Sequence, residues 1–409
     1  MGKKIVRLGT QLFWWILLVF LVEGSASERG LASSSAIYTP VPALRSTCYQ
    51  HDTIAVNSIR FGTTPGGEGF IEPMGIAADA HGNVWVASSG EDTVTRFVNA
   101  WDYGVRTTIN IANPPGKTLF LEPAGIAVDG SENIWVTNVG NNTVTELLRS
   151  ADYSSEKARV FSGGNTEFHG PLGIAVDPFG NLWVANAGGN SVTELLKAED
   201  FSPAHARNYS GGNTRFSGPE WIASDASGNI WVTNFRGDSV TELVRSSGYS
   251  IDSTRNISGG KSGISSPIGI AVDHSQNIWI ANNGNKSVTE LTKGSDYSPD
   301  KALNISGGNT AIHDPAGIAV DGIDNIWVAN AYNASVTELT KASGYSPFAA
   351  ISIWGGNTRF KNPWGIAIDP FGNVWVTNFH DGSVTKMICA ASPVPPLVRQ
   401  IQKTGGKNP

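Results

Sequence analysis

The chain has 409 residues, of which 40% are hydrophobic and 16% are charged, and its formal net charge is -6. The hydrophobic content is too high for a disordered protein. Because the chain has no basic excess to neutralise phosphates, the composition argues against a nucleic-acid partner.

The first 26 residues have the features of a secretory signal peptide. Three basic residues lie within the first seven, an apolar run follows at 12–22, and small residues stand at 24–26. A run of eleven residues is well short of the roughly 20 needed to span a bilayer. We therefore expect cleavage after Ala26, a secreted or periplasmic chain and no membrane span after cleavage.

One pattern then recurs seven times, P-x-G-I-A-V-D-x-x-G-N-x-W-V-x-N followed by S/T-V-T-E-L, with small variations. The first two units are 50 residues apart and the others 48. The prolines that begin the units are Pro73, Pro123, Pro171, Pro219, Pro267, Pro315 and Pro363. A fixed period of this length indicates one structural unit per repeat.

Each unit is expected to be β throughout. In the third unit the expected strands are 174–176, 182–185, 191–195 and one around 207–209, separated by turns rich in Asp, Asn and Gly. Four short antiparallel strands in every 48 residues are typical of a propeller blade. The sequence therefore predicts an all-β, seven-bladed β-propeller with four antiparallel strands per blade.

Several repeated residues have a structural interpretation. The tryptophan of each unit is expected to be core, because a buried indole contributes a large apolar surface. The aspartate of each unit starts a turn, where its side chain accepts hydrogen bonds from the backbone two residues on. The asparagines that end the second strands are interpreted as turn residues, with a polar channel mouth as the alternative. The glutamates of VTEL are expected to be solvated or to protect strand edges; they are Glu146, Glu194, Glu242, Glu290 and Glu338.

The ends of the chain predict how the ring closes. Residues 53–61 have the pattern of a strand, while the last unit stops after its third strand at 384–388. Pairing these two segments completes the last blade and removes two open edges. We therefore expect a tail at 27–52, a propeller at 53–389 and a flexible tail at 390–409.

The two cysteines fall at matching points of the repeat. Cys48 lies 25 residues before Pro73, and Cys389 lies 26 residues after Pro363. Both positions map to the seam at which the ring is expected to close. In an exported protein, this arrangement predicts a disulfide between them.

The repeated motif resembles the NHL repeat and the blades of streptogramin-lyase-type propellers, from Pro73 to Ile388. This resemblance implies that ligands bind on the face that carries the loops between strands two and three. It also implies a lyase site with an acidic residue at the end of a second strand, a histidine two positions on, and a second histidine in the preceding blade. His380 matches the first histidine, but Asn378 and Tyr332 stand at the other two positions.

Large side chains interrupt the otherwise small residues expected on that face. Rigid aromatic rings beside charged groups are typical of recognition surfaces; the alternative is drift in exposed loops. One predicted cluster is Trp221, Phe235 and Arg236, and the other is Tyr332, Trp364, Phe379 and His380. The full candidate set is Glu220, Trp221, Phe235, Arg236, Tyr332, Trp364, Phe379 and His380.

These residues predict a monomeric, secreted binding module for a protein or glycan partner, without catalytic residues or cofactor. The alternative is a metal-dependent lyase or lactonase with a divalent cation at the central channel. The seven histidines form no spaced metal pair in the sequence, which favours the binding module.

Peptide mapping under non-reducing conditions should recover Cys48 and Cys389 in one cross-linked peptide pair. Cys389→Ser should then lower the melting temperature without changing the secondary structure, because the bond closes a very long loop. Recovery of both thiols unbridged from oxidised protein would contradict this prediction.

Overall fold

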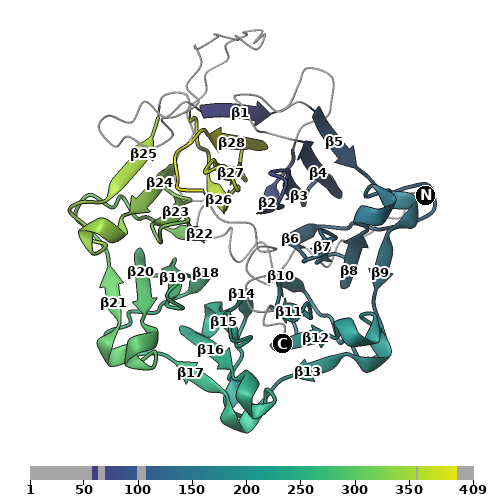
Figure 1. Ribbon diagram of the computed structural model, residues 1–409, viewed down its shortest axis with the longest axis horizontal. Helices are drawn as coiled ribbons and strands as arrows, with labels where there is room; N and C mark the ends of the chain where they lie inside the picture. The colour runs from purple at the N-terminus through teal and green to yellow at the C-terminus, as the bar shows by residue number, and fades with distance from the viewer. Residues whose placement is uncertain (1–57, 63–69, 99–106, 356–357, 394–409) are drawn as a thin grey trace, which may run out of the picture. The chain divides into compact units, whose positions relative to one another are not determined.

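The computed structural model describes residues 58–62, 70–98, 107–355 and 358–393. These residues form seven four-stranded antiparallel sheets arranged as blades around a ring (Figure 1). In the described part of the chain, the only helices are short 3-10 turns. The predicted seven-bladed propeller is therefore confirmed. The signal peptide, the tail at 27–52 and Cys48 lie outside the described residues, and the expectations about them stay predictions.

Each blade contributes one strand to each of four layers, from the centre of the ring outwards. The first strands are β2 (Pro73–Ala78), β6 (Pro123–Val128), β10 (Pro171–Val176), β14 (Pro219–Ser224), β18 (Pro267–Val272), β22 (Pro315–Val320) and β26 (Pro363–Ile368). The second strands are β3 (Val84–Ser88), β7 (Ile134–Asn138), β11 (Leu182–Asn186), β15 (Ile230–Asn234), β19 (Ile278–Asn282), β23 (Ile326–Asn330) and β27 (Val374–Asn378).

The outer two layers follow the same order. The third strands are β4 (Thr93–Val98), β8 (Thr143–Leu147), β12 (Ser191–Leu195), β16 (Ser239–Leu243), β20 (Ser287–Leu291), β24 (Ser335–Leu339) and β28 (Ser383–Met387). The fourth strands are β5 (Thr107–Ile111), β9 (Arg159–Phe161), β13 (Arg207–Tyr209), β17 (Arg255–Ile257), β21 (Leu303–Ile305), β25 (Ile351–Trp354) and, in blade 7, β1 (Ser58–Gly62).

Short 3-10 turns follow the third or fourth strands, except η7, which lies between the second and third strands of blade 4. They are η2 (Arg149–Ala151), η3 (Ser155–Lys157), η4 (Lys197–Glu199), η5 (Pro203–His205), η6 (Gly212–Thr214), η7 (Phe235–Gly237), η8 (Arg245–Ser247), η9 (Ile251–Ser253), η10 (Lys293–Ser295), η11 (Pro299–Lys301) and η12 (Lys341–Ser343).

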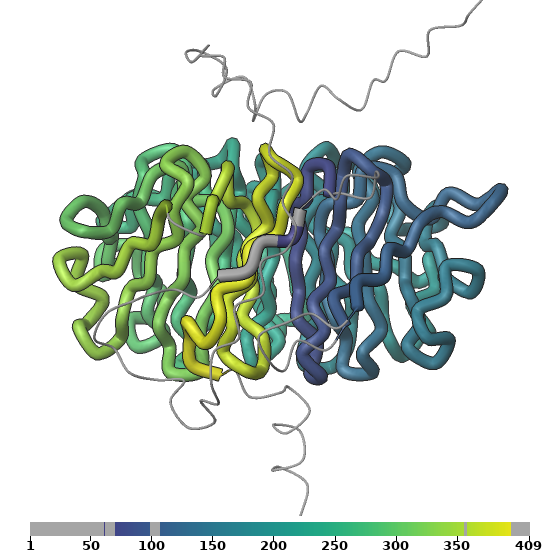
Figure 2. The backbone as a smooth tube through the Cα atoms, turned by 90° about the horizontal axis from the view of Figure 1, so that it is seen from above, coloured from purple at the N-terminus to yellow at the C-terminus, as the bar shows by residue number. Residues whose placement is uncertain are grey.

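The ring is closed at its centre and at its edge. Each first strand contacts the first strands of both neighbouring blades, including β26 with β2. In blade 7, β1 pairs antiparallel with β28, with Ser58 opposite Met387 and Gly62 opposite Ser383. Figure 2 shows the ring from the side, with turns along both of its faces.

The glycine after each repeat proline is required by the approach of neighbouring first strands. A Cβ atom added at Gly75 would clash with the backbone oxygen of Ala124 in the next blade. Gly125 faces the oxygen of Leu172 in the same way. At these positions the repeat therefore keeps glycine, because a side chain would clash with the backbone of the next blade. Blade 4 is the exception, with Trp221 at this position.

The hydrophobic core lies between blades, and the repeat tryptophans dominate it. All seven are at most 1% exposed. In the first five blades the tryptophan packs against an aromatic ring of the following blade, with ring centroids 4.5–4.7 Å apart. At the closing seam, Trp375 packs against Phe97 of blade 1 at 5.4 Å. The prediction that these tryptophans are core residues is confirmed.

The repeat aspartate holds the tryptophan and the turn in a single network. In blade 7, Oδ1 of Asp369 accepts hydrogen bonds from the backbone N–H groups of Phe371 at 2.9 Å and Asn373 at 3.0 Å. Its Oδ2 accepts from Asn373 Nδ2 at 2.7 Å and from Trp375 Nε1 at 2.9 Å. The aspartate–tryptophan hydrogen bond recurs in every blade. The predicted structural role of the aspartates is confirmed.

The expectation for the VTEL glutamates is wrong. All five are at most 7% exposed, because the third strand is covered by a fourth strand and the blade packs on both sides. In blades 2 to 4 an arginine of the fourth strand pairs with the glutamate. In blades 5 and 6 the opposite residues are Leu303 and Ile351, and the glutamates instead accept a hydrogen bond from Asn277 and Asn325.

Glu338 of blade 6 predicts a pH dependence of stability. Burial, together with nearby Asp321, raises its pKa from 4.5 to about 8 in the folded protein. The folded state therefore holds a proton that the unfolded state has lost between these pH values, so the free energy of unfolding falls as pH rises from about 5 to 8. Glu338→Gln should make this fall in the free energy of unfolding smaller, by on the order of a few kcal/mol. Urea unfolding at several pH values across this range measures the change.

Glu156→Gln is the matched control, since the Glu156 side chain is 65% exposed. It should leave the pH profile of unfolding unchanged. A profile that is equally steep in the wild type and in Glu338→Gln would contradict the assignment.

Candidate functional site

The candidate site lies on one face of the ring, here called the loop face. It consists of the turns between second and third strands and the segments that precede each repeat proline. The two lie side by side in each blade: in blade 3, the N–H groups of Ala187 and Gly188 donate to the oxygens of Gly170 and His169, both at 3.0 Å. Residues of both segments are therefore presented together.

The asparagines at the ends of the second strands organise these turns. Asn138 is fully buried, and its Nδ2 donates to the hydroxyls of Thr143 and Thr145, both at 3.0 Å. The other five asparagines donate in the same way to the first and third residues of their third strands. The interpretation as turn residues is confirmed, and because they are buried they do not form an exposed channel mouth.

Neighbouring turns are also joined to each other over part of the ring. The last residue of the turn accepts a hydrogen bond from the backbone N–H that precedes the proline of the next blade; we call this the inter-blade bond. The four donor–acceptor pairs, with distances of 2.7–2.8 Å, are Glu122 to Asp92, Gly170 to Asn142, Gly218 to Asn190 and Ser266 to Asp238.

In blades 5, 6 and 7 the acceptor of the inter-blade bond is replaced. The equivalent residues are Lys286, Ala334 and Gly382, none of which has a side-chain acceptor. Lys286 instead directs its Nζ to Nε2 of His313 in blade 6, at 2.7 Å. The loop face therefore departs from its own repeat over the arc of these three blades.

This arc carries an exposed aromatic platform. Tyr332 is 64% exposed and stacks on His313 with ring centroids 4.1 Å apart and an interplanar angle of 20°. Burial lowers the pKa of His313 and nearby Lys286 acts in the same direction, while Asp314 opposes them. The ring nitrogen of a neutral imidazole can accept a hydrogen bond from the Lys286 ammonium, so the three side chains form one connected group.

Tyr332 was predicted from the sequence, but His313, on which it stacks, and Lys286, which hydrogen-bonds to His313, were not. His313 stands two residues before Pro315, on the segment that lies beside the turn of its own blade. Lys286 ends the turn of the preceding blade. Aligning the residues before each proline with the turns would have brought these positions together.

The remaining residues of the second predicted cluster are in blade 7. Trp364 and Phe379 contact each other, with ring centroids 6.0 Å apart. Trp364 is 9% exposed, Phe379 is half-buried and His380 is exposed. Among the described residues, the recorded ring contact of Tyr332 is with His313 and not with these aromatics.

The first predicted cluster is in blade 4. Glu220 is buried at a repeat position that is apolar in the other six blades. Burial raises its pKa to about 7, while Arg236 acts against this shift. Trp221 is half-buried and packs against the core between blades 4 and 5, whereas Arg236 is exposed. Glu220 and Arg236 are thus close enough to interact, and much of the Trp221 ring serves packing.

The donors that a lyase-type metal would require do not fit this face. Asn378 stands where the resemblance calls for a carboxylate, and its buried amide is engaged with Ser383 and Thr385. Within the described ranges, no three His, Cys, Asp or Glu side chains are grouped closely enough to hold a metal ion. We therefore derive no metal-dependent step.

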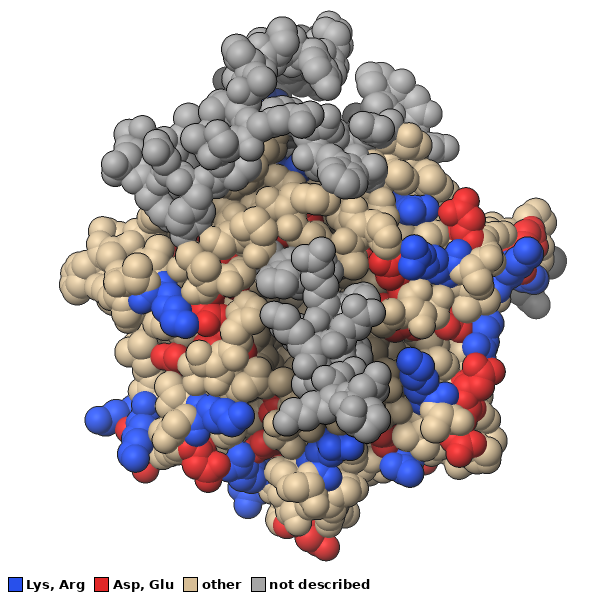
Figure 3. All heavy atoms as spheres, in the orientation of Figure 1, with Lys and Arg blue, Asp and Glu red and all other residues tan. Residues whose placement is uncertain are grey.

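Charges on the face seen in Figure 3 are mixed in sign. Lysine and arginine side chains alternate with aspartate and glutamate around the periphery and form no single basic patch. Among the described residues, no helix is long and apolar enough to cross a membrane.

The sequence matches no protein-family model and no curated protein. Solved structures with the same fold include a streptogramin B lyase, with a TM-score of 0.63 and 16% identity over 80% of this chain and 96% of that one. Virginiamycin B lyase from Staphylococcus aureus follows with a TM-score of 0.62, 16% identity, and 81% and 98% coverage. The extracellular domain of a hybrid two-component system from B. thetaiotaomicron has a TM-score of 0.59 and 15% identity over 79% of this chain and 40% of that one. The chain therefore has the propeller fold of the streptogramin-lyase type.

Proposed function

We propose that this chain is an extracytoplasmic binding module and that the loop face over blades 5 to 7 binds a protein or glycan partner. Export is expected from the signal peptide. Extracellular domains and a bacterial surface component of a secretion system are among the proteins that share the fold. The geometry of the platform favours a glycan.

The observation that carries the proposal is the replacement of the inter-blade bond along one arc. Four consecutive blade junctions keep this bond, and the next three lack its acceptor. The same arc carries the exposed Tyr332, its partners Lys286 and His313, and His380. The structural hydrogen bond is thus lost over the same blades that display large polar and aromatic side chains. This asymmetry is expected of a binding surface.

The chemistry of the platform suits a sugar ring. Tyr332 presents one aromatic ring supported from behind by His313, so little side-chain freedom is lost on binding. Lys286 and the amides of the surrounding turns supply polar groups beside it. A pyranose has an apolar face bounded by hydroxyl groups, which matches a flat ring with donors at its edge.

Position 332 offers a substitution that the repeat itself tolerates. The equivalent residues in blades 1, 2, 3 and 5 are Gly90, Gly140, Gly188 and Gly284. Tyr332→Gly should therefore fold normally. On a glycan array, the wild-type protein should bind a subset of the glycans. Calorimetry with one of these glycans should then show at least about tenfold weaker binding for Tyr332→Gly than for the wild type.

Phe179→Ala is the control, because Phe179 is 47% exposed but belongs to a turn between first and second strands. Phe179→Ala should bind the same glycan with the affinity of the wild type. The proposal fails if Tyr332→Gly binds with wild-type affinity. If the wild type binds no glycan on the array, the glycan form of the proposal fails, and a protein partner is the form to test.

A further inference from the structure

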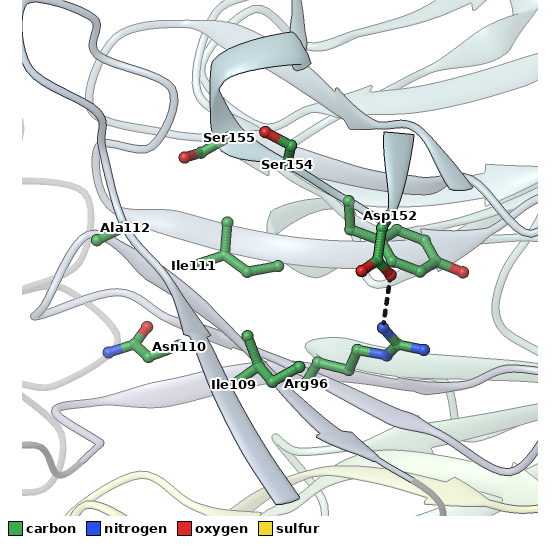
Figure 4. Close-up of a pocket in the computed structure, with 9 residues that line it drawn as sticks. Arg96, Ile109, Asn110, Ile111, Ala112, Asp152, Ser154 and Ser155 are labelled. Carbon is green, nitrogen blue, oxygen red and sulfur yellow. Dashed lines mark ion pairs between the residues drawn. The ribbon is translucent and has the colours of Figure 1, made fainter. Parts of the chain in front are cut away.

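A cavity of about 250 Å³ lies at the outer rim of the ring, between blades 1 and 2 (Figure 4). Its walls come from the third and fourth strands of blade 1 and from the turn that precedes η3 in blade 2. The residues that matter for its chemistry are Arg96, Ile109, Ile111, Tyr153, Ser154 and Ser155. This place is remote in the fold from the loop-face platform of blades 5 and 6.

Blades 2 and 4 show which side chains occupy the equivalent rim position elsewhere in the ring. In blade 2, Arg159 of the fourth strand lies between two carboxylates, 3.3 Å from buried Glu146 and 3.0 Å from Asp200 of the next blade. In blade 4, Arg255 lies in the same way between Glu242 and Asp296. In these two blades the guanidinium thus has two carboxylate partners.

Blade 1 inverts this arrangement. Arg96 occupies the place of the glutamate and is paired across the strands with Ile109, which occupies the place of the arginine. The guanidinium of Arg96 lies 4.7 Å from the ring centroid of Tyr153 and 5.2 Å from that of Trp85. A cation that contacts two aromatic rings is held in position before any ligand arrives.

The guanidinium of Arg96 forms an ion pair with one carboxylate, whereas those of Arg159 and Arg255 each lie between two. Within the described part of the chain, its ion pair is with Asp152 at 3.5 Å, and the Asp152 side chain is 93% exposed. Nε of Arg96 is buried and has no hydrogen-bond acceptor among these residues. A buried donor left without a partner is costly, which favours a ligand that supplies the acceptor.

We propose that this rim cavity binds a small ligand that bears a carboxylate and a short aliphatic body. The carboxylate lies beside Arg96, where a planar guanidinium can form paired hydrogen bonds. Ile109 and Ile111 contact the aliphatic body, and the serines stand at the opposite wall. A cavity of this volume suits one amino-acid residue better than a drug-sized molecule.

Two kinds of ligand carry a carboxylate on a short aliphatic body: a free small acid and the C-terminal residue of a peptide. Calorimetric titration of the full chain with N-acetyl-L-leucine tests the first, and a short peptide ending in leucine tests the second. N-acetyl-L-leucinamide and the amidated peptide are the uncharged analogues. The carboxylate forms should bind saturably, and the amides at least about tenfold more weakly. Binding of both acids identifies a site for small acids in general, and binding of the peptide alone identifies a peptide terminus.

Two variants at the cavity keep the result interpretable. Arg96→Gln should abolish binding of the carboxylate forms. The double variant Arg96→Glu with Ile109→Arg restores the pair found in blades 2 to 4, so it should fold and also fail to bind. Arg159→Gln, the matched change in blade 2, should leave binding intact. The proposal would be overturned if neither carboxylate form bound saturably up to millimolar concentration, or if wild type and Arg96→Gln bound equally.

Discussion

Every blade depends on the hydrogen bonds accepted by the repeat aspartate in the turn between the first and second strands. One carboxylate satisfies two backbone donors, an asparagine amide and the indole N–H of the tryptophan, as at Asp369. The turn geometry and the orientation of the largest core side chain are thereby set together. Because that tryptophan packs against the next blade, a local turn determines how neighbouring blades meet.

A scaffold built in this way separates stability from recognition. The aspartate networks and the inter-blade aromatic contacts recur around the ring. The loop face carries a second, weaker set of connections, and these are the ones that change over blades 5 to 7. The rim cavity follows the same logic, since the Glu–Arg pair of blades 2 to 4 is replaced in blade 1 by Arg96 opposite Ile109. In both places the departure from the repeat marks the candidate site.

The fold was predictable because its determinants repeat. A period of 48 with one aspartate, one asparagine and one tryptophan at fixed offsets predicts both the blade and its turn. The burial of Glu338 was not predictable in the same way, since a charged residue on an outer strand is ordinarily exposed, and only the covering fourth strand and the neighbouring blade bury it. His313 and Lys286 were missed because their roles depend on side-chain contacts. His313 stacks on Tyr332 within blade 6, and Lys286 reaches His313 across the junction between blades 5 and 6.

Amide hydrogen exchange tests most directly the central claim, that the loop face is structurally asymmetric around a regular ring. The N–H groups of Glu122, Gly170, Gly218 and Ser266 donate to the inter-blade bond. For the equivalent N–H groups of Asp314, Asn362 and Glu72, the residues at the acceptor position of the repeat are Lys286, Ala334 and Gly382, whose side chains have no acceptor. Residue-resolved exchange of the free protein should show the first four protected and the last three exchanging faster. Equal protection at all seven junctions would contradict the account.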